Sequence, residues 1–409
     1  MRTVGDLAGR VRLCAALLTV FVLLAVSACS DGAQQTSSGP SKTAASPSLE
    51  PDQSLPELAV EVLVEDLSIP WDLAQAPDGT VIFDQRDGGL SAYFPDGSLR
   101  SIEADFDDLF VRGETGLMGL VLDPGFAANR RFFTCQGFAG RDRDIRVISW
   151  EMAADYSAAT RLTDPLVAGL PLSSGRHGGC RLRFDTDGAL LIGTGDAATG
   201  SNAQDLMSLG GKTLRVDPET GQPWPENPFL FLGNAEANPL IYTYGHRNVQ
   251  GLALRPDTDD VYSAEHGPDV DDEVNLLMPG ANYGWNPVGE DARDYNESVP
   301  MTDLGIDGAQ PAVWSSGEPA IATSGSTFLD GPAWGGYDGL LLVGLLAGEG
   351  ILALQLGEDG SLISASRLPG FDGTFGRIRT VQLGNDDLLY VTTSNGDGDD
   401  VVLRVTPQL

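Results

Sequence analysis

The segment Ala76-Pro77-Asp78-Gly79-Thr80-Val81-Ile82-Phe83 joins a tight turn to a short run of β-branched and aromatic residues. Proline and glycine favour the turn, whereas valine, isoleucine and phenylalanine favour a strand. The same combination returns along the chain in the ranges 94–97, 184–192, 216–221, 255–262 and 384–391. Turns at such short intervals predict an all-β chain. Degenerate repeats of several strands favour a β-propeller over a sandwich, although the pattern alone leaves the number of blades open.

The first and last strand-like runs of this repeat region lie near Val60–Val64 and at Val401–Val405. Pairing between them would close a ring of sheets and remove the exposed sheet edges. We therefore expect these two runs to be neighbours in one sheet. No long stretch shows an apolar period of helical type, so we expect few helices.

The composition fits many short strands and limits the partners. The 409 residues include 51 Gly and 25 Pro, which suit strands joined by tight turns. The formal net charge is −33, and so acidic a surface repels phosphate, so we expect no nucleic-acid partner. Such a surface tolerates cations such as calcium, and it also keeps an exported protein soluble.

The N-terminal residues indicate export. Three arginines precede an apolar run over residues 13–26, which has the length of a signal-peptide core rather than of a membrane-spanning helix: Arg2, Arg10 and Arg12. The run ends at Val26-Ser27-Ala28-Cys29, which resembles the bacterial lipobox. We therefore expect residues 1–29 to be a signal peptide with Cys29 as the lipidated first mature residue. The alternative is a plain signal peptide that is cut near Ala28.

Residues 30–57 are rich in Ser, Pro and Ala and show no periodicity, so they predict a disordered tether. A tether of this kind lets a globular domain over residues 58–409 stand off a membrane. The prediction is an exported lipoprotein that contacts the membrane only through its lipid anchor and faces the periplasm or the outer envelope.

The cysteines are consistent with an exported protein. Cys14 leaves with the signal peptide and Cys29 is the predicted anchor, which leaves Cys135 and Cys180 for the folded domain. Two cysteines in an oxidising compartment favour one disulfide. They could instead be two separate buried thiols, because the sequence does not show whether they lie within bonding reach.

Only three histidines are present, and each lies in a glycine-rich segment: His177, His246 and His266. A histidine in a loop is a candidate general base because its ordinary pKa lies near neutral pH, but histidine is also a common structural residue. The spacing argues against a zinc site, since His177 is far from the other two and none belongs to a paired helical motif.

These segments follow one another in an order and at spacings that resemble the PQQ-dependent sugar dehydrogenases (PQQ is pyrroloquinoline quinone). This family comprises soluble glucose and aldose sugar dehydrogenases and is also called the glucose/sorbosone dehydrogenase family. The likeness runs from about Leu67 to Val405. The motifs that carry it are Ile69-Pro70-Trp71-Asp72, Glu114-Thr115-Gly116-Leu117-Met118-Gly119-Leu120, Asp123-Pro124-Gly125-Phe126, His177, Gly193-Thr194-Gly195-Asp196-Ala197, Gly245-His246-Arg247-Asn248 with Gln250-Gly251, Glu265-His266-Gly267-Pro268 with Asp271-Asp272-Glu273-Val274-Asn275, Asn282-Tyr283-Gly284-Trp285, and Gly376-Arg377-Ile378-Arg379.

The resemblance implies a six-bladed β-propeller with a site for PQQ and calcium on its upper face. His177 matches the general base that takes a proton from the anomeric hydroxyl of an aldose while hydride moves to the quinone, so the products would be a lactone and the quinol. Matches to the PQQ-binding positions are Glu114, Arg247, Asn248, Arg377 and Arg379. The carbonyl groups of Gly267 and Pro268 match the ligands of the calcium ion, and those of Tyr283 and Gly289 fit a second, structural calcium.

The chain departs from the family pattern at two positions. Relatives that oxidise glucose carry a PQQ-contacting lysine after a Leu-Leu-Val strand, but here Leu341-Leu342-Val343 is followed by residues 344–350 without a lysine. The residue before the predicted base is Arg176, which could contact a carboxylate of PQQ or could lower the basicity of His177 by repulsion.

Three functions follow from this pattern. The first is oxidation of a small-molecule sugar, with electrons passed to a respiratory acceptor. The second, favoured by the missing lysine, is a propeller lipoprotein that has lost the cofactor and acts as a binding or scaffold module. The third is a calcium-dependent propeller that hydrolyses lactones or esters. The loops between Asp291 and Pro319 differ from those of relatives, so the identity of the sugar does not follow from the resemblance.

Overall fold

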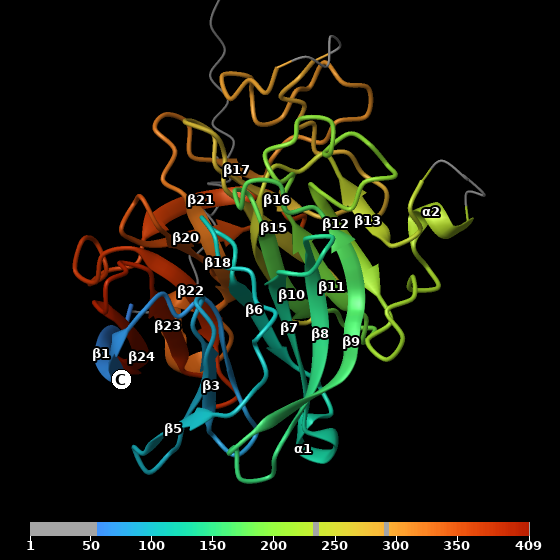
Figure 1. Ribbon diagram of the computed structural model, residues 1–409. Helices are drawn as coiled ribbons and strands as arrows, with labels where there is room; N and C mark the ends of the chain where they lie inside the picture. Colours follow the sequence, from blue (N-terminus) through green and yellow to red (C-terminus); the bar gives the residue numbers. More distant parts are fainter. Residues whose placement is uncertain (1–54, 232–236, 290–293, 409) are drawn as a thin grey trace, which may run out of the picture. The chain divides into compact units, whose positions relative to one another are not determined.

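The computed structural model describes residues 55–231, 237–289 and 294–408 (Figure 1). The predicted signal peptide and Cys29 lie outside these residues, as does almost all of the predicted tether. Within them, the strands form six antiparallel four-stranded sheets, here called blades 1 to 6. The chain is therefore all-β, as the turn pattern predicts.

The blades follow the chain in order. Blade 1 holds β2 (Leu73–Gln75), β3 (Val81–Asp84), β4 (Leu90–Tyr93) and β5 (Leu99–Ile102). Blade 2 holds β6 (Leu117–Leu122), β7 (Arg131–Phe138), β8 (Asp144–Met152) and β9 (Ala159–Leu170). Blade 3 holds β10 (Gly179–Phe184), β11 (Leu190–Thr194), β12 (Lys212–Val216) and β13 (Ile241–Tyr244).

The other three blades complete the series. Blade 4 holds β14 (Val249–Leu254), β15 (Val261–Glu265), β16 (Glu273–Leu276) and β17 (Trp314–Ser315). Blade 5 holds β18 (Thr323–Phe328), β19 (Leu341–Leu345), β20 (Gly350–Leu356) and β21 (Leu362–Arg367). Blade 6 holds β22 (Ile378–Leu383), β23 (Leu389–Thr393), β24 (Asp400–Gln408) and β1 (Glu57–Leu67).

The first strands of the blades contact one another in a closed series. Strand β2 contacts β6, which contacts β10, and the series continues through β14, β18 and β22 back to β2. Six sheets whose innermost strands meet in this way form a six-bladed propeller, which confirms the predicted fold.

Blade 6 closes the ring with strands from both ends of the propeller. Strand β1 pairs antiparallel with β24, and Val60 lies opposite Val405. This confirms the pairing that the two valine-rich runs predict. Strand β1 begins at Glu57, one residue inside the segment predicted to be a tether.

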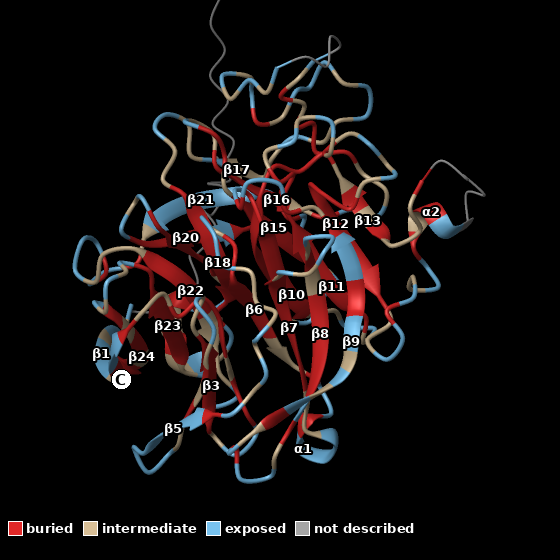
Figure 2. Cartoon of the chain, in the orientation of Figure 1, coloured by how far each residue is buried: buried red, intermediate tan, exposed pale blue. Residues whose placement is uncertain are grey.

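Burial follows the position of each strand in its blade. The inner strand β10 and its neighbour β11 are buried along almost their whole length, because both of their faces pack against other blades. The outermost strand β21 is almost entirely exposed (Figure 2). This gradient explains why the inner strands read as continuous apolar runs.

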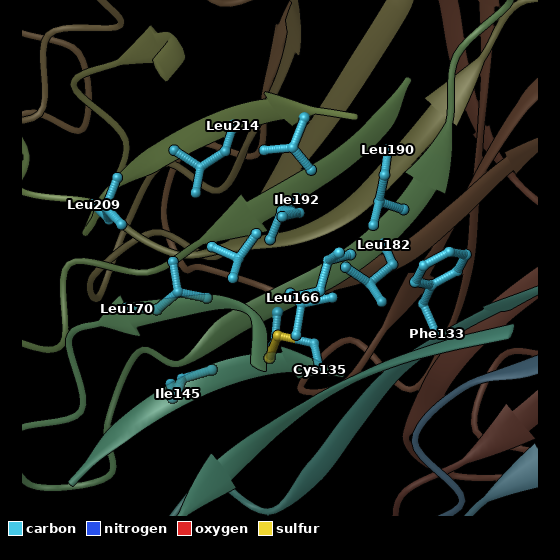
Figure 3. Packing of buried hydrophobic residues seen from close by; sticks show 14 of the residues in the cluster. Phe133, Cys135, Ile145, Leu166, Leu170, Leu182, Leu190, Ile192, Leu209 and Leu214 are labelled. Carbon is cyan, nitrogen blue, oxygen red and sulfur yellow. A yellow bond between two sulfur atoms is a disulfide. The ribbon is translucent and has the colours of Figure 1, made fainter. Parts of the chain in front are cut away.

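Blades 2 and 3 share the cluster of buried side chains shown in Figure 3. Ile145 of blade 2 packs there with Ile192 and Leu214 of blade 3, and each such buried side chain contributes about 1.5–3 kcal/mol. A disulfide between Cys135 of β7 and Cys180 of β10 crosses this cluster. The predicted disulfide is therefore confirmed, and it joins two blades.

The described residues contain three short helices, α1 (Phe126–Asn129), α2 (Pro228–Phe231) and the 3-10 helix η1 (Pro332–Tyr337). In this part of the chain, no helix has both the length and the apolar character needed to cross a membrane.

Candidate active site

The predicted site residues gather at one edge of the propeller because of the way each blade is wound. The first strand of a blade starts at this edge and the second strand returns to it, so residues that precede a first strand or follow a second strand lie there. We call it the upper edge. Glu114 precedes β6, His177 precedes β10, Arg247 and Asn248 precede β14, and Arg377 precedes β22.

His177 is held by a carboxylate on each side of its backbone and ring. Its Nδ1 lies 2.8 Å from Oδ1 of Asp196, and its main-chain N–H donates to Oε2 of Glu114 at 3.0 Å. The ring is buried. Because Nδ1 is engaged with a carboxylate, the neutral ring carries its proton there and keeps the Nε2 lone pair for another partner. His177 therefore has the arrangement of an oriented general base.

Asp196 is itself fully hydrogen-bonded. Its Oδ2 accepts from the indole of Trp285 and from the hydroxyl of Tyr295, both at 2.7 Å, and its Oδ1 also accepts from the main chain of Ala198. Sequence reasoning quoted the segment that holds Asp196 but assigned it no role, and it missed Tyr295. Asp196 follows β11 directly, and an acid at the upper end of a second strand is the signal that could have identified it.

A hydrogen-bonded chain leads from the base to a buried arginine. Glu114 also accepts from the amide of Asn248 at 3.3 Å, whose carbonyl accepts from Gln250 at 3.2 Å. Gln250 in turn accepts from Nη1 of Arg379 at 3.0 Å. The structure thus connects four of the predicted site positions with His177, and adds Gln250.

Arg377 and Arg379 bring positive charge to the site without a carboxylate partner in the described part of the chain. Arg377 donates from Nε to the carbonyl of Ser394 at 3.1 Å. Arg379 is buried, and its Nε has no hydrogen-bond partner among the described residues. Burial and the charges of Arg181 and Arg377 lower the pKa of Arg379 to about 9. A buried guanidinium with a free N–H is suited to bind an anionic ligand.

Arg176 and Arg247 share a carboxylate that sequence reasoning missed. Glu297 accepts from Arg176 at 2.6 Å and from Arg247 at 3.0 Å. Arg176 also lies near the base, with its Nη2 3.4 Å from Nε2 of His177. Glu297 belongs to the long connection between β16 and β17, where the chain differs from its relatives, so no motif pointed to it.

Gly267 and Pro268 form a tight turn after β15 at the same edge. The N–H of Gly267 donates to Asp272 at 2.8 Å, and a side chain on Gly267 would lie only 2.5 Å from the carbonyl oxygen of Val270. Among the hydrogen bonds of the described residues, none ends on the carbonyl oxygen of Gly267 or Pro268. Two free carbonyl groups fit a hard cation such as calcium.

The second predicted calcium position has less support. The ring of Tyr283 stacks on His246 at 4.7 Å, and Gly289 is exposed. Across residues 55–231, 237–289 and 294–408, no group of three or more His, Cys, Asp or Glu side chains could hold a metal ion. The role of Tyr283 and Gly289 stays a prediction.

The other two histidines differ from His177. Both ring nitrogens of His246 are occupied, by Glu265 at 2.6 Å and Thr243 at 2.7 Å, so His246 is a structural residue. Burial, together with the charge of Arg247 and other cations, lowers the pKa of His266 to about 3 and keeps this ring neutral.

The turn that lacks the family lysine connects β19 and β20 at the upper edge. It exposes Ala347 and Glu349. The guanidinium of Arg367 donates to the carbonyl of Gly348 and pairs with Asp372 at 2.7 Å. A cation is therefore present at this turn, but it already has a carboxylate partner.

The relatives of this chain are sugar dehydrogenases. The chain is 31% identical over 355 residues to an aldose sugar dehydrogenase of Escherichia coli (strain K12), a match that covers 85% of this chain and 93% of the relative. It is 28% identical over 263 residues to quinoprotein glucose dehydrogenase B of Acinetobacter calcoaceticus, which covers 56% of this chain and 52% of the relative.

Solved structures agree with this result. A glucose dehydrogenase of Thermus thermophilus superimposes with a TM-score of 0.73 at 35% identity and covers 85% of this chain and 100% of that one. The PQQ-bound form of an aldose sugar dehydrogenase from Streptomyces coelicolor superimposes with a TM-score of 0.69 at 27% identity, over 86% of this chain and 99% of that one. The family model described as Glucose / Sorbosone dehydrogenase matches residues 67–404, which include nearly the whole propeller. The chain belongs to the glucose/sorbosone dehydrogenase family.

Proposed function

We propose that this protein is a PQQ-dependent dehydrogenase that oxidises the CH–OH group of an aldose to a lactone and passes the electrons to a respiratory acceptor. One observation carries the proposal. His177, oriented by Asp196, lies on the same edge of the propeller as three arginines, of which Arg377 and Arg379 form no ion pair in the described residues. A base beside unpaired cations is what an alcohol dehydrogenase with an anionic cofactor requires.

The residues at the upper edge fit PQQ, which is a tricarboxylate. The free N–H of buried Arg379 and the free Nε of Arg247 offer charge-assisted hydrogen bonds. Asn248 and Glu114 would complete the binding surface, and the carbonyl groups of Gly267 and Pro268 would hold calcium beside it. When bound, PQQ supplies a two-electron acceptor for the hydride.

The residues of the chain would handle the proton. Nε2 of His177 takes the proton of the sugar hydroxyl, since Nδ1 is already committed to Asp196. The negative charge of Asp196 stabilises the imidazolium that results. Trp285 and Tyr295 keep Asp196 in place by donating to its other oxygen.

A dye-linked assay tests the proposal. The soluble propeller, from about residue 58, is loaded with PQQ and calcium and given a panel of aldoses. We expect sugar-dependent reduction of the dye, and we expect His177→Ala to lose about 10²–10⁴-fold of the rate. Arg404→Ala, which removes a cation paired with Glu61 in the outer strands of blade 6, serves as the control. Dye reduction that survives in His177→Ala would contradict the assigned base.

The missing lysine favours a second function, a propeller that binds a partner without PQQ. Loss of one charge-assisted contact reduces affinity by roughly ten- to a hundredfold. Failure to bind PQQ at high micromolar concentration would therefore favour this function over the dehydrogenase. Pull-down with the anchored protein would then identify the partner.

We also propose that the propeller is exported and anchored through a lipid on Cys29. The lipobox-like Val26-Ser27-Ala28-Cys29 and the Ser/Pro/Ala-rich segment that follows support this proposal. Mass spectrometry of the N-terminal peptide should find a diacylglyceryl group on Cys29. Cys29→Ala should abolish that modification, and an unmodified mature N-terminus in the wild type would contradict the proposal.

A further inference from the structure

Glu297 places a negative charge across two cations of the candidate active site. Its carboxylate accepts from Nη2 of Arg176 and from Nη2 of Arg247. The side chain of Arg247 is only 4% exposed and that of Glu297 is 27% exposed, so solvent screens this pair less than an ordinary surface ion pair. Glu297 therefore neutralises a buried guanidinium at the edge where an anionic ligand is expected.

The neighbours of Glu297 hold it in this position. The hydroxyl of Tyr295 donates to Asp196 at 2.7 Å, and the N–H of Asn296 donates to the carbonyl of Pro287 at 2.8 Å. The loop is thus fixed at the two residues that precede Glu297. Its carboxylate is presented to the site by the fold, and does not depend on a chance surface contact.

The cations of the site fall into two classes. Arg377 and Arg379 have no carboxylate partner among the described residues, whereas Arg176 and Arg247 share Glu297. Burial alone would raise the pKa of Glu297, but the hydrogen bond from Arg176 and the charges of both arginines outweigh it and lower that pKa. At neutral pH Glu297 is ionised and occupies the Nη2 group of Arg247 that a ligand carboxylate would use.

We propose that Glu297 is an internal competitor for the carboxylate ligand of this site. Its carboxylate must leave Arg247 before a carboxylate-bearing cofactor can bind that guanidinium. The inference rests on the proposed function, since PQQ is the ligand concerned. It implies that this loop lowers the affinity for the cofactor and that Arg176, which stays within reach of Glu297, takes over the displaced charge.

A titration of the soluble propeller with PQQ in the presence of calcium, followed by absorbance, tests the inference. We expect Glu297→Gln to bind PQQ roughly tenfold more tightly than the wild type, because the amide no longer competes as a charged acceptor. Glu358→Gln removes the same charge from the turn between β20 and β21, at the opposite edge of blade 5, and should leave the affinity unchanged. The trimethyl ester of PQQ lacks the carboxylates, so Glu297→Gln should not alter its binding.

Four outcomes separate the possibilities. Tighter binding of PQQ by Glu297→Gln, with the ester unaffected, supports the inference. Equal or weaker binding by the variant overturns the inference and leaves the proposed function intact. No binding of PQQ by either protein overturns both. If thermal melts show that Glu297→Gln is misfolded, Glu297→Ala replaces it, and the same directions of change decide.

Discussion

At the scale of single residues, the site is organised around Asp196. This carboxylate accepts four hydrogen bonds, from His177, Ala198, Trp285 and Tyr295, and it is fully buried. A carboxylate with every lone pair occupied cannot rotate away from the histidine that it orients. The direction of the His177 ring is therefore set by residues from blades 3 and 4, which lie far apart in the sequence.

We predict that Asp196→Asn lowers kcat/KM for the best aldose by about 10²–10⁴-fold. The amide cannot hold the protonated Nδ1 of His177 and gives no charge to stabilise the imidazolium. The affinity for PQQ should change little, because Asp196 faces the base and not the arginines. Steady-state kinetics with PQQ-saturated protein give the first quantity, and titration gives the second.

The matched control for this prediction is Asp205→Asn, which changes an exposed carboxylate in the same connection between β11 and β12. Its turnover should stay within about twofold of the wild type. Turnover of Asp196→Asn at the wild-type level would contradict the role given to this carboxylate.

The sequence predicted some of these residues and missed others for a physical reason. His177, Arg247 and Arg379 stand in short motifs, so their order along the chain identified them. Tyr295 and Glu297 come from a long connection without a motif, and only the fold brings them within 3.2 Å of groups more than 40 residues away. Contacts of this kind depend on how the blades meet, which local patterns do not contain.

At the scale of secondary-structure elements, the turn chemistry predicted the strands well. Gly79 has a φ of 87°, a value that favours glycine, and the turn it forms joins β2 to β3 as the first quoted segment predicts. The pairing of β1 with β24 also followed from two apolar runs. The number of blades did not follow from the repeats, because each blade departs too far from a common length, and it came from the resemblance.

The disulfide between β7 and β10 is the covalent connection between blades 2 and 3, and it lies in the buried cluster of Figure 3. Its two cysteines are 45 residues apart, so the bond restricts the unfolded chain by about 4 kcal/mol in a chain-entropy model. We predict that Cys135→Ala combined with Cys180→Ala lowers the free energy of unfolding by about 2–4 kcal/mol.

Urea unfolding followed by circular dichroism measures this loss. Reduction of the unfolded wild type with dithiothreitol before refolding should produce a loss of similar size, whereas dithiothreitol should not affect the double variant. Equal stability of the wild type and the double variant would contradict the prediction.

At the scale of the whole molecule, the net charge of −33 is the dominant electrostatic property. Like charges on a compact protein repel one another, and salt screens this repulsion. The Debye length falls from about 30 Å at 0.01 M to about 8 Å at 0.15 M ionic strength. We predict that the melting temperature rises by on the order of a few degrees over this range of sodium chloride.

Differential scanning calorimetry in the presence of a chelator measures this effect without a contribution from bound calcium. A melting temperature that stays constant or falls with salt would show that attractive ion pairs, such as that between Arg131 and Asp123, outweigh the general repulsion.

The central claim is that the upper edge binds PQQ and transfers hydride from a sugar to it. A stopped-flow experiment tests this most directly: the wild-type propeller is loaded with one equivalent of PQQ and calcium, mixed with an aldose in the absence of any other acceptor, and followed by the absorbance of the quinone. We predict a single exponential conversion to the quinol that saturates with sugar and slows by at least 10²-fold in His177→Ala. An unchanged quinone spectrum in a complex that demonstrably holds PQQ, with every aldose of the panel, would contradict the claim.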